Sequence, residues 1–170
     1  LMELSKETDT PIKIRACDTM GYGVSYPGSV LPRSVPGIIY GLSQHAGVPS
    51  QWIEWHGHND FHKVLVNGVT AWLYGCGGVN GTLMGFGERT GNAPLEALVI
   101  DYISLTGNDE AADPTVITEI AQYFEKELDY RIPDNYPFAG KDFNATSAGI
   151  HVDGLAKNEE IYNIFDTTKI

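Results

Sequence analysis

Two histidines separated by one glycine, in the stretch WHGHND at residues 55 to 60, are the first side chains here that suggest chemistry. On a strand, residues i and i+2 project from the same face, so His56 and His58 are expected to point together, with Gly57 leaving room between them. Two imidazoles on one face can bind a divalent metal, which then needs a further ligand from elsewhere in the chain. The alternative is a pair of loop histidines with no shared ligand.

Polar residues in two glycine-rich turns are candidates for that further ligand and for substrate contacts. Asn92 ends the segment GFGERTGN, which matches neither the dinucleotide fingerprint nor a phosphate-binding loop with Gly-Lys-Ser/Thr. Its amide oxygen can act as a ligand, or the residue can cap a following helix that has Pro94 in its first turn. Asp18 and Thr19, in CDTMG, are either site residues or an ordinary turn after a strand.

Strand and helix patterns alternate three times over the first part of the chain. The predicted strands cover 12–17, 50–58 and 77–85, and the predicted helices cover 34–47, 59–77 and 92–107. This alternation with short connections is typical of a parallel sheet, open or closed into a barrel, so the fold class is α/β. The carboxyl ends of parallel strands share one edge, where we expect the histidine pair and both polar turns to lie.

The sequence changes character after residue 107. An amphipathic helix is predicted within 113–130, an extended linker over 131–143, and two short helices within 144–165, broken near Gly154 and Asn158. His151 lies in this last block and Tyr162 follows it; a single histidine in a helical segment is typically structural. We place a boundary near 108 to 114 and assign 1–110 to the α/β part and 111–170 to the helix, linker and helical subdomain.

Composition excludes some partners. The net charge of −11 argues against nucleic acid or an anionic membrane as the main partner, although a bound cation can still attract an anionic substrate. No apolar run reaches the roughly 18 residues of a membrane span. Cys17 and Cys76 form no spaced motif and predict buried free thiols in a reducing compartment, the cytoplasm.

Four motifs in order carry a family resemblance: CDTMG, HGHND, NGTLMGFGERTGNAPLE and AGIHVDG. They resemble the DRE-TIM metallolyases, specifically the acyl-CoA-condensing synthases for homocitrate, Re-type citrate, isopropylmalate and citramalate. The resemblance covers essentially the whole chain, and the closing KNEEIYNIFDTTKI is most similar to homocitrate synthase and the Re-type citrate synthases. It implies a (β/α)8 TIM barrel, of which this chain supplies about strands 6 to 8, followed by a linker and a small helical subdomain.

The resemblance also implies roles for the polar residues of the first part of the chain. His56 and His58 match the family's ligands of a divalent cation, with Zn, Mn and Mg all open, and Asn92 matches a further ligand or near-ligand. Thr19 matches a residue that contacts the 2-oxo acid. The implied reaction is a Claisen condensation of acetyl-CoA with a 2-oxo acid such as 2-oxoglutarate or oxaloacetate, completed by thioester hydrolysis.

In the last block, His151 matches a subdomain histidine implicated in acid–base work, and Tyr162 matches its tyrosine partner. Family members supply this pair to the barrel of the neighbouring subunit, which implies a homodimer with exchanged C-terminal subdomains. This sequence departs from the family by lacking the Asp-Arg-Glu motif that follows the first barrel strand, together with the first four strands and most of the fifth unit.

We therefore expect the chain to be the C-terminal half of a barrel enzyme. Three parallel strands leave two open edges, so the fragment alone is expected to associate or aggregate and to be inactive. Two alternatives stay open. One is a lyase of the same superfamily, such as a hydroxymethylglutaryl-CoA lyase, that runs the bond change in reverse; the other is a non-catalytic subunit of a split enzyme.

Overall fold

The structure is a computed structural model that describes residues 1–108 and 110–163. It divides into two compact units, Leu1–Asp101 and Tyr102–Ile170, so the division falls inside helix α4 (Leu95–Thr106). The sequence places the boundary later, near 108 to 114, where the composition changes. The buried residues of α4 lie in its first turn, at Glu96, Ala97 and Leu98, and its later turns add none.

A four-stranded parallel sheet forms the centre of the first unit, with the strands in chain order. The strands are β1 (Ile14–Asp18), β2 (Ile53–Gly57), β3 (Gly78–Thr82) and β4 (Ala93–Pro94). Helices α2 (Val35–Tyr40) and α3 (Val64–Leu73) connect them, and α1 (Met2–Thr8) precedes β1. The predicted alternation of strands and helices, with a parallel sheet, is confirmed.

The start of α4 differs from the prediction. Asn92 and Pro94 were expected at the cap and in the first turn of this helix, but Ala93 and Pro94 pair with Gly81 and Thr82 of β3 and the helix begins at Leu95. Proline is compatible with this position because β4 is the last strand of the described sheet, where one side of the backbone has no ladder partner.

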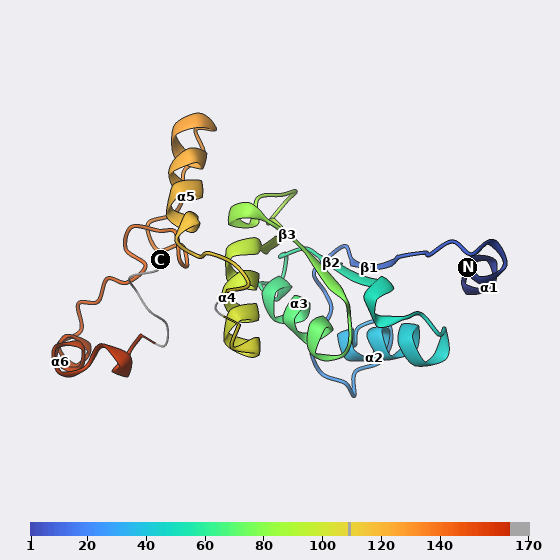
Figure 1. Cartoon of the computed structure of the whole chain (residues 1–170). Helices are drawn as coiled ribbons and strands as arrows, with labels where there is room; N and C mark the ends of the chain where they lie inside the picture. Colours follow the sequence, from blue (N-terminus) through green and yellow to red (C-terminus); the bar gives the residue numbers. More distant parts are fainter. Residues whose placement is uncertain (109, 164–170) are drawn as a thin grey trace. The chain divides into compact units, whose positions relative to one another are not determined.

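One face of the sheet is apolar and covered by helices (Figure 1). Ile53 and Trp55 alternate inward on β2 and pack with Val35 and Ile39 of α2 and with Ala71 of α3. Helix α2 begins where the sequence predicts, because the Oγ of Ser34 accepts a hydrogen bond of 3.0 Å from the backbone N–H of Gly37. It continues into a π-helical turn at Gly41–His45.

The opposite face of the sheet is polar. Glu54 and His56 alternate with the core residues of β2, and the register sets Glu54 beside Arg15 of β1. His56 lies in one row with Cys17 of β1 and Asn80 of β3. Glu54 forms ion pairs of 2.9 Å with both Lys13 and Arg15. The polar side chains that could take part in catalysis or binding therefore share one face of the sheet, away from the helices.

Both cysteines are free, as predicted, but only one is buried. Cys17 is exposed because it projects from the polar face of β1, so the expectation of two buried thiols is wrong for this residue. Cys76 is buried, and its Sγ lies 3.2 Å from the carbonyl oxygen of Ile53. Burial raises the pKa of the Cys76 thiol.

The second unit contains α5 (Val116–Glu127), α6 (Gly149–Lys157) and a 3-10 turn at Glu159–Ile161. The buried residues of α5 recur at helical spacing, at Ile117, Ala121 and Phe124, as its amphipathic pattern predicts. Asn158 breaks the last two helices as expected, but Gly154 lies inside α6, so the predicted break there is wrong. Over the described ranges, no helix combines the length and apolarity that crossing a membrane requires.

Candidate functional site

His56 and His58 lie together at the carboxyl end of β2. Their ring centroids are 5.1 Å apart and the rings are nearly perpendicular, at 86°. His58 is buried, with 9% of its surface exposed, and its backbone N–H donates to the carbonyl of Asp18 at 3.2 Å. The strand alternation thus predicts their juxtaposition correctly, and their role as metal ligands stays a prediction.

The surroundings of the two rings suit a bound cation. The pKa of His56 is lowered, first by burial and then by the neighbouring His58 and Arg15, which favours the neutral imidazole that binds metals. The Nδ1 atom of His58 is buried and has no hydrogen-bond partner in the structure. A buried ring nitrogen without a partner is unfavourable unless a ligand completes it, so the donor set fits a divalent cation.

Asn92 joins this group through β2 and does not cap α4. It forms an isolated antiparallel bridge with His58, and its Nδ2 donates to the carbonyl of Gly57 at 3.1 Å. The bond fixes the amide so that its Oδ1 lies against Gly87, where an added Cβ would come within 2.0 Å of that oxygen. Within residues 1–108 and 110–163, no three His, Cys, Asp or Glu side chains converge on a metal position, so a complete site needs ligands of another kind or origin.

Arg89 links three loops at this edge of the sheet. Its guanidinium forms a bidentate pair with Asp60, with N–O distances of 2.9 and 3.1 Å, and also donates to the carbonyl of Thr19. These hydrogen bonds hold the pKa of the Asp60 carboxyl below its ordinary value. Arg89 has a φ of 53°, a left-handed conformation that is costly for a residue with a Cβ. The sequence did not predict this pair, although Asp60 lies in HGHND and Arg89 in GFGERTGN.

The CDTMG turn contacts the histidine strand through its backbone. The carboxylate of Asp18 accepts hydrogen bonds from the N–H groups of Tyr22 and Gly23, at 2.8 and 2.9 Å, which supports the turn interpretation for this residue. Gly21 packs so closely that a Cβ would lie 2.3 Å from the carbonyl oxygen of His58. Thr19 is exposed at the same turn, next to the group but with its carbonyl occupied by Arg89.

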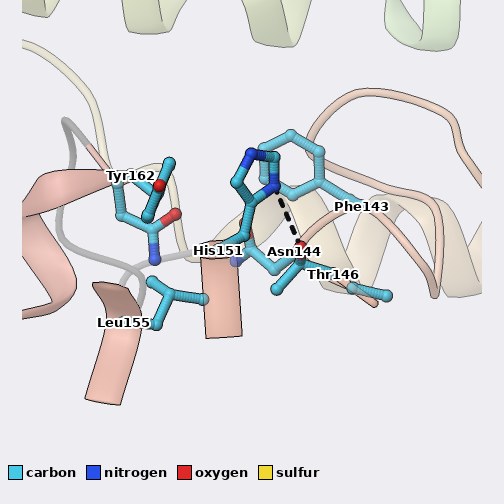
Figure 2. Close-up of a pocket in the computed structure, with 8 residues that line it drawn as sticks. Phe143, Asn144, Thr146, His151, Leu155 and Tyr162 are labelled. Carbon is cyan, nitrogen blue, oxygen red and sulfur yellow. Dashed lines mark hydrogen bonds between the residues drawn. The ribbon is translucent and has the colours of Figure 1, made fainter. Parts of the chain in front are cut away.

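His151 and Tyr162 form a separate group in the second unit. Their ring centroids are 4.6 Å apart with an interplanar angle of 47°, so they contact each other ring to ring. The Oγ1 of Thr146 lies 3.3 Å from Nδ1 of His151 (Figure 2). These three residues line an open hollow of about 340 Å³ together with Phe143, Asn144, Ala145, Leu155 and Asn163. The structure thus brings together the two residues that the family resemblance pairs.

Over all 170 residues the chain is 61% identical to a Citrate (Re)-synthase of Syntrophus aciditrophicus and 59% identical to one of Clostridium kluyveri. It spans 27% of the length of the first and 38% of the second, well under half of either relative.

A solved structure of an HMG-CoA lyase from Acinetobacter baumannii matches with a TM-score of 0.59 at 18% identity, covering 86% of this chain and 45% of that one. At this identity the likeness concerns the fold alone. The HMGL-like family model matches residues 3–124, more than half of the chain. The chain therefore belongs to the HMGL-like family of DRE-TIM metallolyases.

Proposed function

We propose that this chain is part of a synthase that condenses acetyl-CoA with a 2-oxo acid, and that it contributes a divalent-metal site and an acid–base pair. Both citrate synthase relatives align with it from end to end at about 60% identity, which supports this activity. Their names favour oxaloacetate as the 2-oxo acid, because citrate is the condensation product of an acetyl group with oxaloacetate. The chain spans 27% and 38% of these relatives, so other segments supply the rest of the site.

The observation that carries the proposal is the unpartnered Nδ1 of His58 beside the half-buried ring of His56. Leaving a buried polar atom without a partner costs about 1–3 kcal/mol, a cost that a bound cation would remove at Nδ1 of His58. Zn, Mn and Mg are all compatible with two imidazoles and oxygen ligands, and Asn92 is the proposed source of one oxygen.

We place the first unit as about strands 6 to 8 of a (β/α)8 barrel, with 1–110 as the partial barrel and 111–170 as the helix, linker and subdomain. The parallel strands β1, β2 and β3, with α2 and α3 packed on one face, support this assignment, and the two-residue β4 is a fourth strand that the sequence did not predict. In a barrel the uncovered face becomes the interior, and active sites lie at the carboxyl ends of the strands. Arg15, Glu54 and His56 would then line the interior, with the histidines at the active end.

The residues of the chain divide the work of the reaction. His56 and His58 would hold a divalent cation, which would supply Lewis acidity for the bound 2-oxo acid. Thr19 contacts the same acid, and the Arg89–Asp60 pair holds its loop against the histidine strand. His151, in contact with Tyr162, accepts the proton of the acetyl methyl group or returns a proton to the product oxygen.

The proposal extends to the assembly. The His151–Tyr162 pair serves the barrel of a partner subunit in a homodimer with exchanged subdomains, in a reducing compartment, the cytoplasm, that suits two free cysteines. A synthase is favoured over a lyase because the family model stops at residue 124, whereas both citrate synthase relatives align across α6 and its histidine.

The test uses the full-length polypeptide that contains this sequence. Acetyl-CoA is supplied with oxaloacetate, 2-oxoglutarate, 2-oxoisovalerate or pyruvate, and the release of free thiol is measured. We expect release with oxaloacetate, and loss of bound metal in His56→Ala and His58→Ala but not in the control His45→Ala, an exposed histidine at the end of the π-helical turn. The absence of thiol release with every 2-oxo acid would refute the activity, and metal retained in both site variants would refute the ligand assignment.

A further inference from the structure

We infer that Thr146 and Gly154 are positioning residues for His151. Thr146 holds Nδ1 of the imidazole, so that Nε2 is the nitrogen that exchanges protons, and Gly154 leaves the space in which the Tyr162 ring lies against that imidazole. The inference rests on the proposed role of His151 in proton transfer. Thr146 and Gly154 together set the position of the His151 and Tyr162 rings on which that role depends.

Gly154 lies within α6, one turn after His151, so both residues are on the same side of the helix. A Cβ at Gly154 would come within 2.4 Å of Cε2 and 3.2 Å of Cδ2 of Tyr162. Glycine in the middle of a helix is less favourable than alanine, so its presence here requires a reason. The close approach of the Tyr162 ring supplies that reason, since any side chain would displace the ring from His151.

A second glycine in α6 provides the comparison. Gly149, at the start of the helix, has no atom within 4 Å of an added Cβ. An alanine there meets open space. Packing therefore requires glycine only at the position that faces Tyr162.

Thr146 acts on the other side of the imidazole. Its Oγ1 lies 3.3 Å from Nδ1, and Figure 2 shows the second ring nitrogen pointing away from Thr146. A hydroxyl both donates and accepts, so this contact persists whether or not Nδ1 carries a proton. The ring therefore keeps its orientation while Nε2 gains and loses a proton, which suits a group that acts first as base and then as acid.

The first experiment measures the position of the Tyr162 ring without measuring activity. In the full-length polypeptide with 13C-labelled histidine, the Cε1–H signal of His151, assigned with His151→Gln, is expected to be displaced by the ring current of Tyr162. Gly154→Ala should remove that displacement, whereas Gly149→Ala and Tyr162→Phe should retain it. Retention in Gly154→Ala would overturn the assignment of Gly154.

The second experiment tests Thr146 by kinetics. Thr146→Val, which keeps the shape and removes the hydroxyl, should lower kcat about tenfold with KM for both substrates changed less than about twofold, and Thr146→Ser should restore kcat. An unchanged kcat in Thr146→Val, or no rescue by serine, would overturn the assignment of Thr146. If the parent protein releases no thiol with any 2-oxo acid, the proposed function fails, while the ring-current experiment still decides the geometry.

Discussion

Gly21 offers a direct test of how the CDTMG turn supports the histidine pair. Its φ is +61°, and an added Cβ would lie 2.3 Å from the carbonyl oxygen of His58. Contacts of a Cβ shorter than 3.0 Å essentially do not occur, so Gly21→Ala must displace one of the two backbones by at least 0.7 Å (3.0 − 2.3). One of these two backbones belongs to His58, a proposed metal ligand.

Two terms set the expected loss of stability. The left-handed conformation costs alanine about 1–2 kcal/mol, and the backbone displacement adds roughly another 1–3 kcal/mol. Gly47→Ala is the matched control, since Gly47 has a φ of +67° and open space around an added Cβ. Gly47→Ala should lose only the stability that the left-handed conformation costs alanine, about 1–2 kcal/mol.

Urea unfolding of the full-length polypeptide and its two variants measures both terms, and a metal-affinity titration measures the effect on the site. We expect Gly21→Ala to be the less stable variant by about 1–3 kcal/mol and to bind metal about tenfold more weakly, with Gly47→Ala near the parent in affinity. Equal stability of the two variants within about 0.5 kcal/mol, together with equal metal affinity, would show that the turn does not position His58.

The remaining predictions concern titration, thiol reactivity and metal binding. Because the pKa of His56 is lowered in the folded state, the unfolded state binds a proton at this residue first on acidification. The stability of the metal-free chain should therefore fall as the pH drops through about 6.5. Urea unfolding at pH 7.5 and 5.5 should show a smaller pH dependence in His56→Gln than in the parent. An unchanged pH dependence in that variant would contradict the shift. Exposed Cys17 should react with a thiol reagent in the native state, and buried Cys76 only on unfolding, as counted by mass spectrometry; early labelling of Cys76 would contradict its burial. The 170-residue chain alone should bind Zn²⁺ at least tenfold more weakly than the full-length polypeptide, because its described residues provide no third His, Cys, Asp or Glu ligand. A competition titration measures both affinities, and equal values would show that the chain completes the site itself.

Local patterns in the sequence predicted most of the first unit. Alternation along β2 placed Trp55 in the core and His56 on the other face, and Ser34 marked the start of α2. These predictions succeed because each depends on residues that are neighbours in the chain. Glycine and asparagine were less informative: Gly154 lies inside a helix that it was expected to break, and Asn92 bonds to Gly57 of β2, 35 residues away, where a helix cap was expected.

In the candidate site, too, features that depend on neighbouring residues were predicted, and contacts between distant residues were not. The proximity of His56 and His58 follows from the period of a strand, but the pair formed by Arg89 and Asp60 joins two loops 29 residues apart. No spacing rule identifies such a pair, because the strand register first has to bring the loops together. The left-handed φ of Arg89 was also unpredictable, since nothing in the sequence marks it and the ion pair stabilises it.

The distribution of unpartnered polar atoms gives a reason, independent of any relative, to place a binding site on the polar face. Six side-chain atoms in the described part of the chain are buried without a hydrogen-bond partner. Three of them belong to His58, Asn80 and Thr82. Asn80 lies beside His56 in the register, Thr82 follows two residues later on the same face, and the His58 ring adjoins His56. A folded chain contains few such atoms, and each one calls for an explanation. These three atoms lie on the polar face at the carboxyl ends of two adjacent strands, where they are available to a ligand that approaches this face.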